Sequence, residues 1–459
     1  MIPLPLGRVA EITSGALTGQ ADPGAVVRGP VVIDSRAAEP GSLFAAIRGE
    51  RADGHDFAAQ ALASGAAAVL ASRPVDGPAV VVGDVVAALA KLANAVVTNL
   101  PKATVVGVTG SAGKTSTKDL LARLTARIGP TVAPVGSYNN EIGHPLTVLK
   151  ADEDTRFLVL ELSARNAGHI AYLAGIAPPS IGVVLNVGTA HLGVFGGKEA
   201  IARAKGELPE ALPSSGVAVL NLDDPLVAAM SGRTRARVLY FGRSRGAHVR
   251  ASHETLDDRG RARFTLHTPS GEAEVALRLH GAHAVENALA AAAAAHELGL
   301  SPAAIAEELS LAEPRSRWRM EVTDRADGVT VINDAYNANP DSMRAAFAAM
   351  HALAGHRRKF AVVASLRELG DDAAELNAGV GRLAAGAGLE ALVVVGDDAG
   401  QIIAGAPDAI HAPDVEAAVA ELTGRLAPGD VVLIKGPRAA GLEKVAEALL
   451  TTGSGGDAR

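Results

Sequence analysis

Short apolar runs alternate with polar, helix-forming stretches along most of the chain. In the middle of the chain the runs read TVVGVTG, RFLVLELS, SIGVVLNVG and GVAVLNLD, with helical segments between most of them. Strands of a parallel sheet have this nearly continuous apolar character, because helices cover both faces of such a sheet. The pattern therefore predicts an α/β fold built on a parallel sheet.

Changes in the pattern divide the chain into three regions. Residues 1–100 alternate short strand-like runs, such as AVVRGPVVID and AAAVLAS, with loops. Residues 101–314 hold the parallel-sheet pattern, then a hairpin-like insert between Ala247 and His280 and an Ala-rich helix from about Ala282 to Leu298. Residues 315–459 repeat the alternation with GVTVINDAY, KFAVVASL, EALVVVGD and DVVLIKG. We therefore expect three α/β domains, with ligands at the carboxyl ends of the strands in the third.

Composition excludes several classes of protein. The 459 residues include 48% hydrophobic and 20% charged residues and carry a net charge of -7, which is typical of a soluble, mildly acidic globular protein. No strong salt-dependent binding to nucleic acid is expected. The absence of cysteine excludes disulfides, thiolate nucleophiles and cysteine metal clusters. The longest apolar run, ALAAAAAA, is too short to span a bilayer, and the N-terminus lacks the pattern of a secretory signal, so we expect a cytoplasmic protein without membrane insertion.

The stretch VGVTGSAGKTSTKDLL places a glycine-rich turn between a strand and a helix. Backbone N–H groups of such a turn surround phosphate oxygens, and the helix N-terminus adds partial positive charge. Lys114 is expected to reach the β- and γ-phosphates of a nucleotide, and the Thr115 hydroxyl to ligate Mg²⁺. Val108 stands where the strict motif has its first glycine, so the loop is a variant. The predicted ATP contacts are Thr109, Gly110, Ser111, Ala112, Gly113, Lys114, Thr115 and Ser116.

Three further polar residues follow the phosphate loop. Glu161 ends the strand FLVLEL, where a carboxylate can face a metal and phosphates. His191 follows the strand VVLNVG, and Lys205 lies on a predicted helix 14 positions later. Taken singly, Glu161 could cap a helix, His191 could be a loop histidine and Lys205 could extend into solvent. Their order after a phosphate loop favours a shared site.

Six motifs together resemble the Mur ligase family, the ATP-dependent amide-forming enzymes of peptidoglycan synthesis. They read VTGSAGKTST, LELSAR, NVGTAHLGVFG, RAKGEL, HGAHAVENALAAAAAA and INDAYNANPDSM. The resemblance runs from DSRAAEPGSLFAAIRGERADGHDF to LIKGPRAAGLEKV and so covers nearly the whole chain. It implies a small N-terminal uridine-nucleotide domain (1–100), a central phosphate-loop ATPase domain (101–314) and a Rossmann-like C-terminal domain that closes over ATP (315–459).

The resemblance also implies roles for single residues. In the family, the lysine matching Lys205 is carbamylated, which turns a cation into an anionic oxygen ligand near a second Mg²⁺. The implied metal ligands are Thr115, Glu161, His191 and Lys205, and the implied catalytic residues are Lys114, Glu161, His191 and Lys205. Asn287 matches an adenine contact, Asp334 a ribose contact, and Arg319 an arginine that reaches the phosphates when the third domain closes.

Within the family, YNNEIGHPLT and DAYNANPDSM resemble members that join D-alanyl-D-alanine to UDP-N-acetylmuramoyl-tripeptide (UDP-MurNAc-tripeptide). That reaction passes through an acyl phosphate, releases ADP and phosphate, and is the last cytoplasmic step in making the pentapeptide precursor. Diaminopimelate and lysine both stay open as the third peptide residue, and we expect a monomer. The residues implied to receive the two substrates are Asp34, Ser35, Arg36, Asp53, His55, Asn139, Asn140, Tyr336, Asn337 and Asn339.

Some positions depart from the family pattern. Arg165 stands where asparagine is frequent, Gly193 where an acidic residue is frequent and Pro437 where serine is usual, and ASLREL replaces a glycine- and acid-containing turn. None of these removes an expected metal or phosphate ligand. Lys435 and Arg438 either serve the second-substrate pocket or lie at a solvated helix N-terminus.

Three other functions are alternatives to this ligase, and sequence motifs bear on each of them. A sister ligase that adds a diamino acid would carry a YAHTPD type of loop and a DNPR segment, and neither occurs here. Folylpolyglutamate synthase shares the core but lacks the DSR and DGHDF segments. A nucleotide-dependent switch would bind ATP without a carboxylate substrate and would leave Lys205, Asn287 and YNANP without a purpose.

Overall fold

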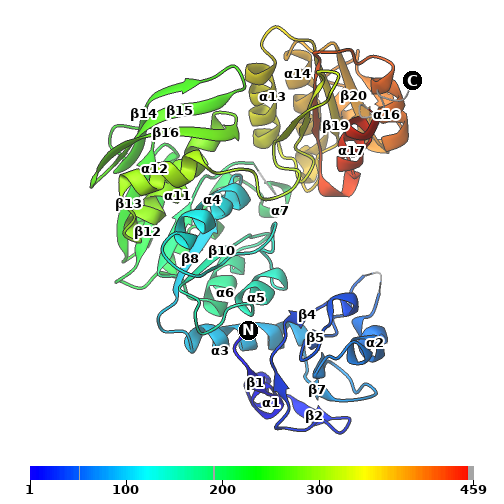
Figure 1. Cartoon of the computed structure of the whole chain (residues 1–459). Helices are drawn as coiled ribbons and strands as arrows, with labels where there is room; N and C mark the ends of the chain where they lie inside the picture. The colour runs from blue at the N-terminus through cyan, green and yellow to red at the C-terminus, as the bar shows by residue number, and fades with distance from the viewer. Residues whose placement is uncertain (51, 190–191, 453–459) are drawn as a thin grey trace.

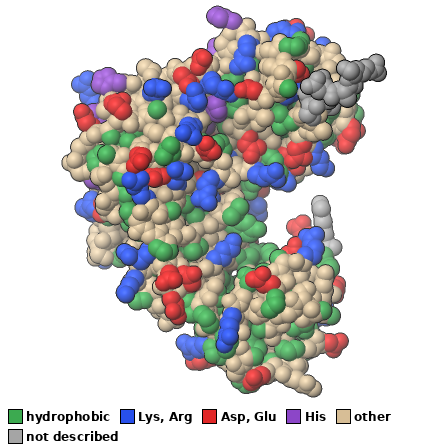
Figure 2. Space-filling view, viewed as in Figure 1, with side chains coloured by type: hydrophobic (Ala, Val, Ile, Leu, Met, Phe, Trp, Pro, Cys, Tyr) green, Lys and Arg blue, Asp and Glu red, His purple; other side chains and the backbone are tan. Residues whose placement is uncertain are grey.

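The computed structural model describes residues 1–50, 52–189 and 192–452. Three α/β units follow one another along the chain, each with its own sheet (Figure 1). The N-terminal and C-terminal units both lie against the central unit and are separated from each other by an open space on one side of the molecule (Figures 1 and 2).

The N-terminal unit has a five-stranded sheet in the order β2-β7-β6-β5-β4, parallel except for β2. The run AVVRGPVVID forms two separate two-residue strands, β3 and β4, rather than one. The strands of this unit are β1 (Leu4–Pro5), β2 (Ala16–Thr18), β3 (Val26–Val27), β4 (Val31–Val32), β5 (Leu43–Ala45), β6 (Ala68–Ala71) and β7 (Ala79–Val81). Its helices are α1 (Leu6–Thr13), η1 (Ser35–Ala37), η2 (Gly54–Phe57), α2 (Ala58–Ala63) and α3 (Val85–Thr98).

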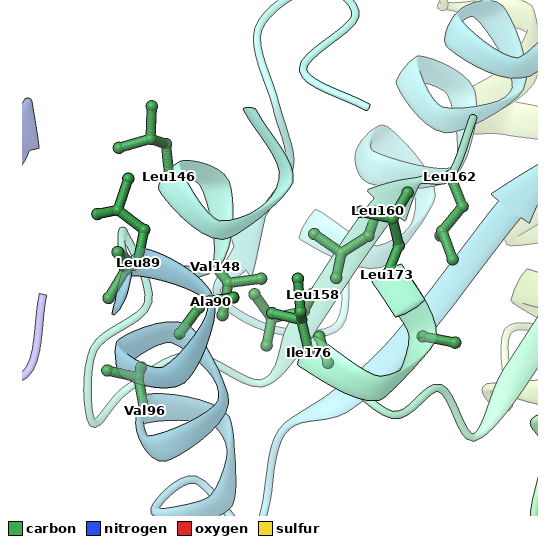
Figure 3. Close-up of a cluster of buried hydrophobic side chains, with 14 of the residues drawn as sticks. Leu89, Ala90, Val96, Leu146, Val148, Leu158, Leu160, Leu162, Leu173 and Ile176 are labelled. Carbon is green, nitrogen blue, oxygen red and sulfur yellow. The ribbon is translucent and has the colours of Figure 1, made fainter. Parts of the chain in front are cut away.

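Helix α3 joins the N-terminal unit to the central unit. Asp84 caps its start by accepting a hydrogen bond from Ala87 N at 3.0 Å. Its apolar side chains belong to one continuous core with α1 on one side and with α5 (Gly143–Val148) and α6 (His169–Ile176) on the other. Figure 3 shows Leu89 of α3 beside Leu146 of α5, and Ala90 of α3 beside Val148 of α5. The two units therefore share buried surface through α3.

The central unit is a nine-stranded sheet in the order β16-β15-β14-β13-β12-β11-β8-β10-β9. The strands from β9 to β14 are parallel, and the predicted hairpin insert is confirmed as antiparallel β14, β15 and β16. The strands are β8 (Thr104–Thr109), β9 (Thr131–Val132), β10 (Phe157–Glu161), β11 (Ile181–Val184), β12 (Val217–Asn221), β13 (Arg237–Gly242), β14 (Val249–Leu256), β15 (Arg261–Thr268) and β16 (Gly271–His280).

Helices cover both faces of the central sheet, as its apolar strands predict. In β10, Leu158 and Leu160 belong to the core shared with α3, whereas Val159 belongs to the core under α4 and α11 on the other face. The Ala-rich segment is confirmed as α11. The other helices are α4 (Lys114–Ala126), α7 (Leu192–Phe195), α8 (Lys198–Lys205), α9 (Glu207–Glu210), α10 (Pro225–Ala228), η3 (Ala229–Arg233), α11 (His283–Glu297) and α12 (Pro302–Ser310).

The C-terminal unit has a six-stranded sheet in the order β17-β18-β22-β19-β20-β21, parallel except for β17. Two apolar cores lie on its two faces. Its strands are β17 (Glu321–Asp324), β18 (Thr330–Asn333), β19 (Lys359–Ala364), β20 (Ala391–Val395), β21 (Ile410–Ala412) and β22 (Val431–Lys435). Its helices are α13 (Pro340–Ala354), η4 (Gly370–Asp372), α14 (Ala373–Ala385), η5 (Asp397–Ala399), α15 (Gly400–Ile403), α16 (Val415–Thr423), η6 (Arg438–Ala440) and α17 (Glu443–Thr452). Within the described part of the chain, no helix is both long enough and apolar enough to cross a bilayer.

Candidate active site

The glycine-rich turn lies between β8 and α4, at the carboxyl end of the central sheet. Gly113 has φ +82°, and a Cβ there would lie 2.2 Å from Asn287 Oδ1, so only glycine fits this position. Ser111 N and Ala112 N donate to Asn186 Oδ1 at 3.0 and 2.9 Å. The loop is thus held by the strand end next to it, with the N-terminus of α4 directed into the cleft.

Lys114 begins α4 at the edge of this loop. Its Nζ donates to Gly110 O at 2.9 Å. Burial lowers the pKa of Lys114, nearby Glu161 opposes that shift, and Arg319 adds to it. Lys114 and Ser116 both line the cleft. Thr109, at the end of β8, is fully buried, and within the described residues its hydroxyl has no hydrogen-bond partner.

Thr115 and Glu161 meet at the centre of the site. Thr115 Oγ1 donates to Glu161 Oε2 at 2.9 Å and lies 2.9 Å from Ser137 Oγ. Asn139 Nδ2 donates to the other carboxylate oxygen, Oε1, at 2.7 Å. Asn140, by contrast, uses its side-chain oxygen to accept from Gly143 N at the start of α5. The Glu161 carboxylate therefore does not cap a helix; it accepts hydrogen bonds from two segments, α4 and the loop that carries Asn139.

Arg319 reaches this cluster from the segment that leads into the C-terminal sheet. Its Nη2 donates to Thr115 Oγ1 and to Ser137 Oγ, both at 3.1 Å. The guanidinium lies 4.1 Å from the centre of the Tyr336 ring. Arg319 Nε is buried and finds no acceptor among the described residues. The arginine therefore has a free donor inside the site.

Lys205 ends α8 and is only 6% exposed, so it does not extend into solvent. Burial lowers the pKa of Lys205 well below its usual value, and the nearby positive charge of Lys114 lowers it further. Lys114 and Glu161 both line the cleft, whereas Lys205 is buried behind it, close enough for the charge of Lys114 to act on it. His191 lies outside the described residues.

Two residues implied to contact the nucleotide already have partners. Asn287, on α11, is 5% exposed and accepts from Thr117 Oγ1 at 3.3 Å. Asp334, just after β18, accepts from Lys435 Nζ at 2.6 Å and from Met320 N at 3.2 Å. Lys435 ends β22 and is 2% exposed, so a solvated helix N-terminus is the wrong interpretation for this lysine.

The YNANP loop has mostly local roles. Asn339 caps α13 through a reciprocal capping box with Ser342. The side-chain oxygen of Asn337 accepts from Ala338 N at 2.9 Å, and its carbonyl accepts from Lys435. Tyr336, Asn337 and Asn339 all line the cleft. Asp341, in the first turn of α13, accepts hydrogen bonds from Thr189 N and Oγ1 at 2.7 and 2.8 Å. These bonds link the C-terminal unit to the loop after β11 in the central unit.

The residues expected to receive the uridine nucleotide lie in the N-terminal unit and not in this cleft. Asp34 caps η1 and pairs with Arg36, and Ser35 donates to Gln60 Oε1 at 2.9 Å. Asp53 Oδ1 lies 2.6 Å from His55 Nδ1, and the buried His55 ring accepts from Ser72 N at 3.0 Å. The cleft is lined by most of the residues expected to bind ATP, though not by Thr109 or Gly110, and by none of these five.

The cleft has a volume of about 990 Å³ and lies between the central and C-terminal units. Its walls include the phosphate loop, Glu161, Arg319 and the YNANP loop. The space-filling view shows the molecule hollowed between the N-terminal and C-terminal units (Figure 2).

The donor set fits a hard divalent cation. Thr115, Ser137 and Glu161 bring two hydroxyls and a carboxylate together, and Mg²⁺ prefers oxygen ligands with few protein carboxylates beside substrate phosphates. No group of three or more acidic or histidine side chains suited to a metal occurs among the residues described. A metal here would therefore depend on phosphate oxygens as well as on the protein.

Comparison with known proteins gives the family. Models of the Mur ligase family match three parts of the chain: "Mur ligase family, catalytic domain" at residues 30–113, "Mur ligase middle domain" at 108–295 and "Mur ligase, glutamate ligase domain" at 318–438. The UDP-N-acetylmuramoyl-tripeptide–D-alanyl-D-alanine ligase of Mycobacterium tuberculosis is 48% identical over 100% of both chains. The chain belongs to the Mur ligase family. The Escherichia coli ligase of the same name is 35% identical over 99% of this chain and 100% of its own.

Solved structures of Mur ligases have the same architecture. A crystal structure of MurF from Acinetobacter baumannii matches with TM-score 0.88 and 32% identity, covering 98% of this chain and 99% of its own. MurF from Thermotoga maritima in complex with ADP matches with TM-score 0.80 and 30% identity over 93% and 98%. The resemblance and the three-unit α/β fold expected from the sequence are confirmed.

Sequence reasoning missed several residues of the site. Asn186 lies two residues after the end of β11, so the rule that placed Glu161 at a strand end could have found it. Glu286 accepts hydrogen bonds from Asn186 and Asn221, and burial raises its pKa. No local motif in the sequence marks Ser137 or Asp341 as part of the site. Their contacts, with Arg319 and Thr189, join segments far apart in the chain.

Proposed function

We propose that this chain joins D-alanyl-D-alanine to UDP-MurNAc-tripeptide and uses ATP to drive the new amide bond. The observation that carries the proposal is the convergence, in one cleft, of the phosphate loop, Glu161 and Arg319. Full-length relatives that are 35 to 48% identical bear the name of this ligase.

The chemistry begins with a carboxylate that must be activated. A free carboxylate is a poor acyl donor, because oxide is a poor leaving group. The terminal carboxylate of the tripeptide attacks the γ-phosphorus of ATP, ADP leaves, and an acyl phosphate forms. The amine of D-alanyl-D-alanine then attacks the acyl carbon, loses a proton, and inorganic phosphate leaves.

The residues of the cleft suit these steps. Lys114 and Arg319 place positive charge where the phosphoryl group moves, and fixed charges of this kind lower the barrier most. Arg319 Nε, which is buried and has no acceptor in the described part of the chain, is a donor available to a phosphate oxygen. The C-terminal unit already contacts the central unit beside the cleft, and closure of the two units around bound substrates would keep out water, which hydrolyses an acyl phosphate.

A divalent cation completes this proposal. Mg²⁺ bound by Thr115 and Glu161, with His191 and a carbamylated Lys205, would supply positive charge that offsets the phosphate oxygens. Neutral amines form carbamates with CO2, releasing a proton, and the lowered pKa of Lys205 favours its neutral form. The polar groups around Glu161 hold its carboxylate toward the same region.

The other candidate functions have weaker support. A diaminopimelate ligase structure matches with 20% identity and TM-score 0.52, and a folylpolyglutamate synthase with 18% identity and TM-score 0.62, so both share only the fold. A nucleotide switch would give the buried Lys205 beside Lys114 no purpose. We also propose a cytoplasmic monomer whose functional domains are residues 1–100, 101–314 and 315–459, for the uridine substrate, ATP, and D-alanyl-D-alanine with closure.

Phosphate release tests the reaction. We expect release to require ATP, UDP-MurNAc-tripeptide and D-alanyl-D-alanine together. Release driven by a diamino acid and the dipeptide nucleotide would favour the sister ligase instead. Comparing tripeptides that end in diaminopimelate and in lysine would assign the third peptide residue.

Lys205→Ala tests the carbamate. We expect turnover to fall by at least about a hundredfold, as when a charge that stabilises the transition state is removed. Short carboxylic acids such as formate or acetate should restore part of the rate, because they can occupy the space of the carbamate. An unchanged rate in this variant would remove the carbamate from the mechanism.

A further inference from the structure

A ten-residue linker, residues 311–320, runs from α12 in the central unit to β17 in the C-terminal unit. Its buried residue Ser316 donates from Oγ to Asp119 Oδ2 at 2.6 Å. Asp119 lies on α4, the helix that the phosphate loop begins. The linker is therefore attached to the nucleotide-binding helix three residues before Arg319.

Asp119 is itself held in place. The neighbouring Lys118 is fully buried, and its ammonium pairs with Asp119 Oδ1 and donates to Pro134 O at 2.7 Å. One carboxylate oxygen thus faces a buried cation, and the other faces Ser316. A hydrogen bond to an ionised carboxylate is stronger than one between neutral groups.

The other end of the linker is attached to the C-terminal unit. Trp318 and Met320 have φ +60° and +50°, in the left-handed region that side chains rarely adopt. Tyr336 N donates to Trp318 O at 3.2 Å, and Met320 N donates to Asp334 Oδ1 at 3.2 Å. Only Arg317 lies between this anchor and Ser316.

Arg319 stands between Trp318 and Met320 in the linker, and its side chain contacts α4. Its contact there, Thr115, stands four residues before Asp119, so the two side chains share one face of the helix. Helix α4 thus holds the linker at Asp119 and receives its arginine at Thr115. The position of Arg319 depends on both contacts.

We propose that Asp119 is a positioning residue that, through Ser316, sets Arg319 at the phosphate end of α4. The inference rests on the proposed function, in which Arg319 acts on phosphate. Loss of the Asp119–Ser316 bond frees the linker and lets Arg319 sample other positions. Binding of the uridine substrate does not depend on this contact.

Ser316→Ala removes the bond with the smallest change. We expect kcat to fall about tenfold, with KM for UDP-MurNAc-tripeptide within about twofold of the wild-type value. Ser316→Thr keeps the hydroxyl and should restore most of kcat. The matched control is Ser310→Ala, which removes a hydroxyl next to the linker that accepts a hydrogen bond from Ala276 N. The kcat of this variant should stay at the wild-type value.

A double-mutant cycle separates positioning from general damage. If Ser316 acts through Arg319, Ser316→Ala should lower kcat little further in an Arg319→Ala background. Asp119→Asn can replace Ser316→Ala in the same cycle and should likewise lower kcat little further in the Arg319→Ala background. Full kcat in Ser316→Ala, or losses that multiply in the double variant, would overturn the proposal.

Trp318 supplies a readout that needs no substrate, because it is the only tryptophan in the chain. Acrylamide quenching of its fluorescence should increase in Ser316→Ala and remain at the wild-type value in Ser310→Ala. Equal quenching in all three proteins would count against the inference. Failure of the proposed function would appear differently, as a wild-type protein that joins no substrates while the quenching difference persists.

Discussion

At the scale of single residues, His144 is a buried titratable group that the proposed reaction does not use. It lies on α5, is 1% exposed, and burial lowers its pKa to about 4. The unfolded chain binds a proton near pH 6.5, whereas the folded chain binds it only near pH 4. The contribution of His144 to stability is therefore complete above pH 6.5 and is lost as the pH falls toward 4.

We predict that wild-type protein loses about 2 kcal/mol of unfolding free energy between pH 7 and pH 5 through this histidine alone. His144→Met should remove that part of the pH dependence, and His356→Met, at an exposed position, should leave it unchanged. Urea unfolding at several pH values measures both. If the unfolding free energy of wild type and of His144→Met changed equally with pH, His144 would not be the source of this pH dependence.

Residues of the site were predictable from sequence where a local motif marks them. The phosphate loop and Glu161 follow from a glycine-rich turn and a strand end. The buried pairing of Lys435 with Asp334 was not predictable, because it joins positions 101 residues apart. Roles that come only from the resemblance, such as the adenine contact of Asn287, stay proposals.

At the scale of elements, apolar periodicity identified most of the buried strands. The strands β8, β10, β11 and β12 and the helix α11 lie where the pattern placed them. Apolar periodicity did not indicate α3, because its Ala and Val residues suit a strand as well as a helix; the Asp84 N-cap and the length of 14 residues are the local features that favour a helix. Packing against α1, α5 and α6 stabilises this helix in the folded protein.

Leu89→Ala tests whether the apolar side chains of α3 stabilise the core that the N-terminal and central units share. Leu89 is fully buried beside Leu146 (Figure 3), so truncation leaves a cavity and should lower the unfolding free energy by about 3 kcal/mol. Lys91→Ala, on the exposed side of the same helix, should change it by less than about 0.5 kcal/mol. Chemical denaturation measures both variants. A loss near zero in Leu89→Ala would show that α3 does not couple the units.

At the scale of the whole molecule, the C-terminal unit contacts the central unit beside the cleft. Besides Arg319, the contacts include Asp341 with Thr189 and an ion pair of Arg259 with Asp324 at 2.6 Å. Helix α7 also meets η4, where a Cβ on Gly193 would lie 2.0 Å from Gly370 N. This close approach gives a reason for glycine at a position where the family often has an acidic residue.

Gly193→Ala should therefore prevent this docking. The added methyl group meets backbone, which cannot move aside as a flexible side chain would, so the C-terminal unit must shift. A displacement of about 1 Å in a group that positions a reactant can cost about a hundredfold in rate, so we expect kcat to fall by about that factor. KM for UDP-MurNAc-tripeptide should change less than about twofold, because the N-terminal unit is unaffected. Small-angle scattering of the variant with bound nucleotide should give a larger radius of gyration than that of the wild type.

Gly175→Ala, where a Cβ meets no atom within 4 Å, is the matched control and should behave as wild type. Wild-type kcat in Gly193→Ala would mean that catalysis uses a different arrangement of the two units.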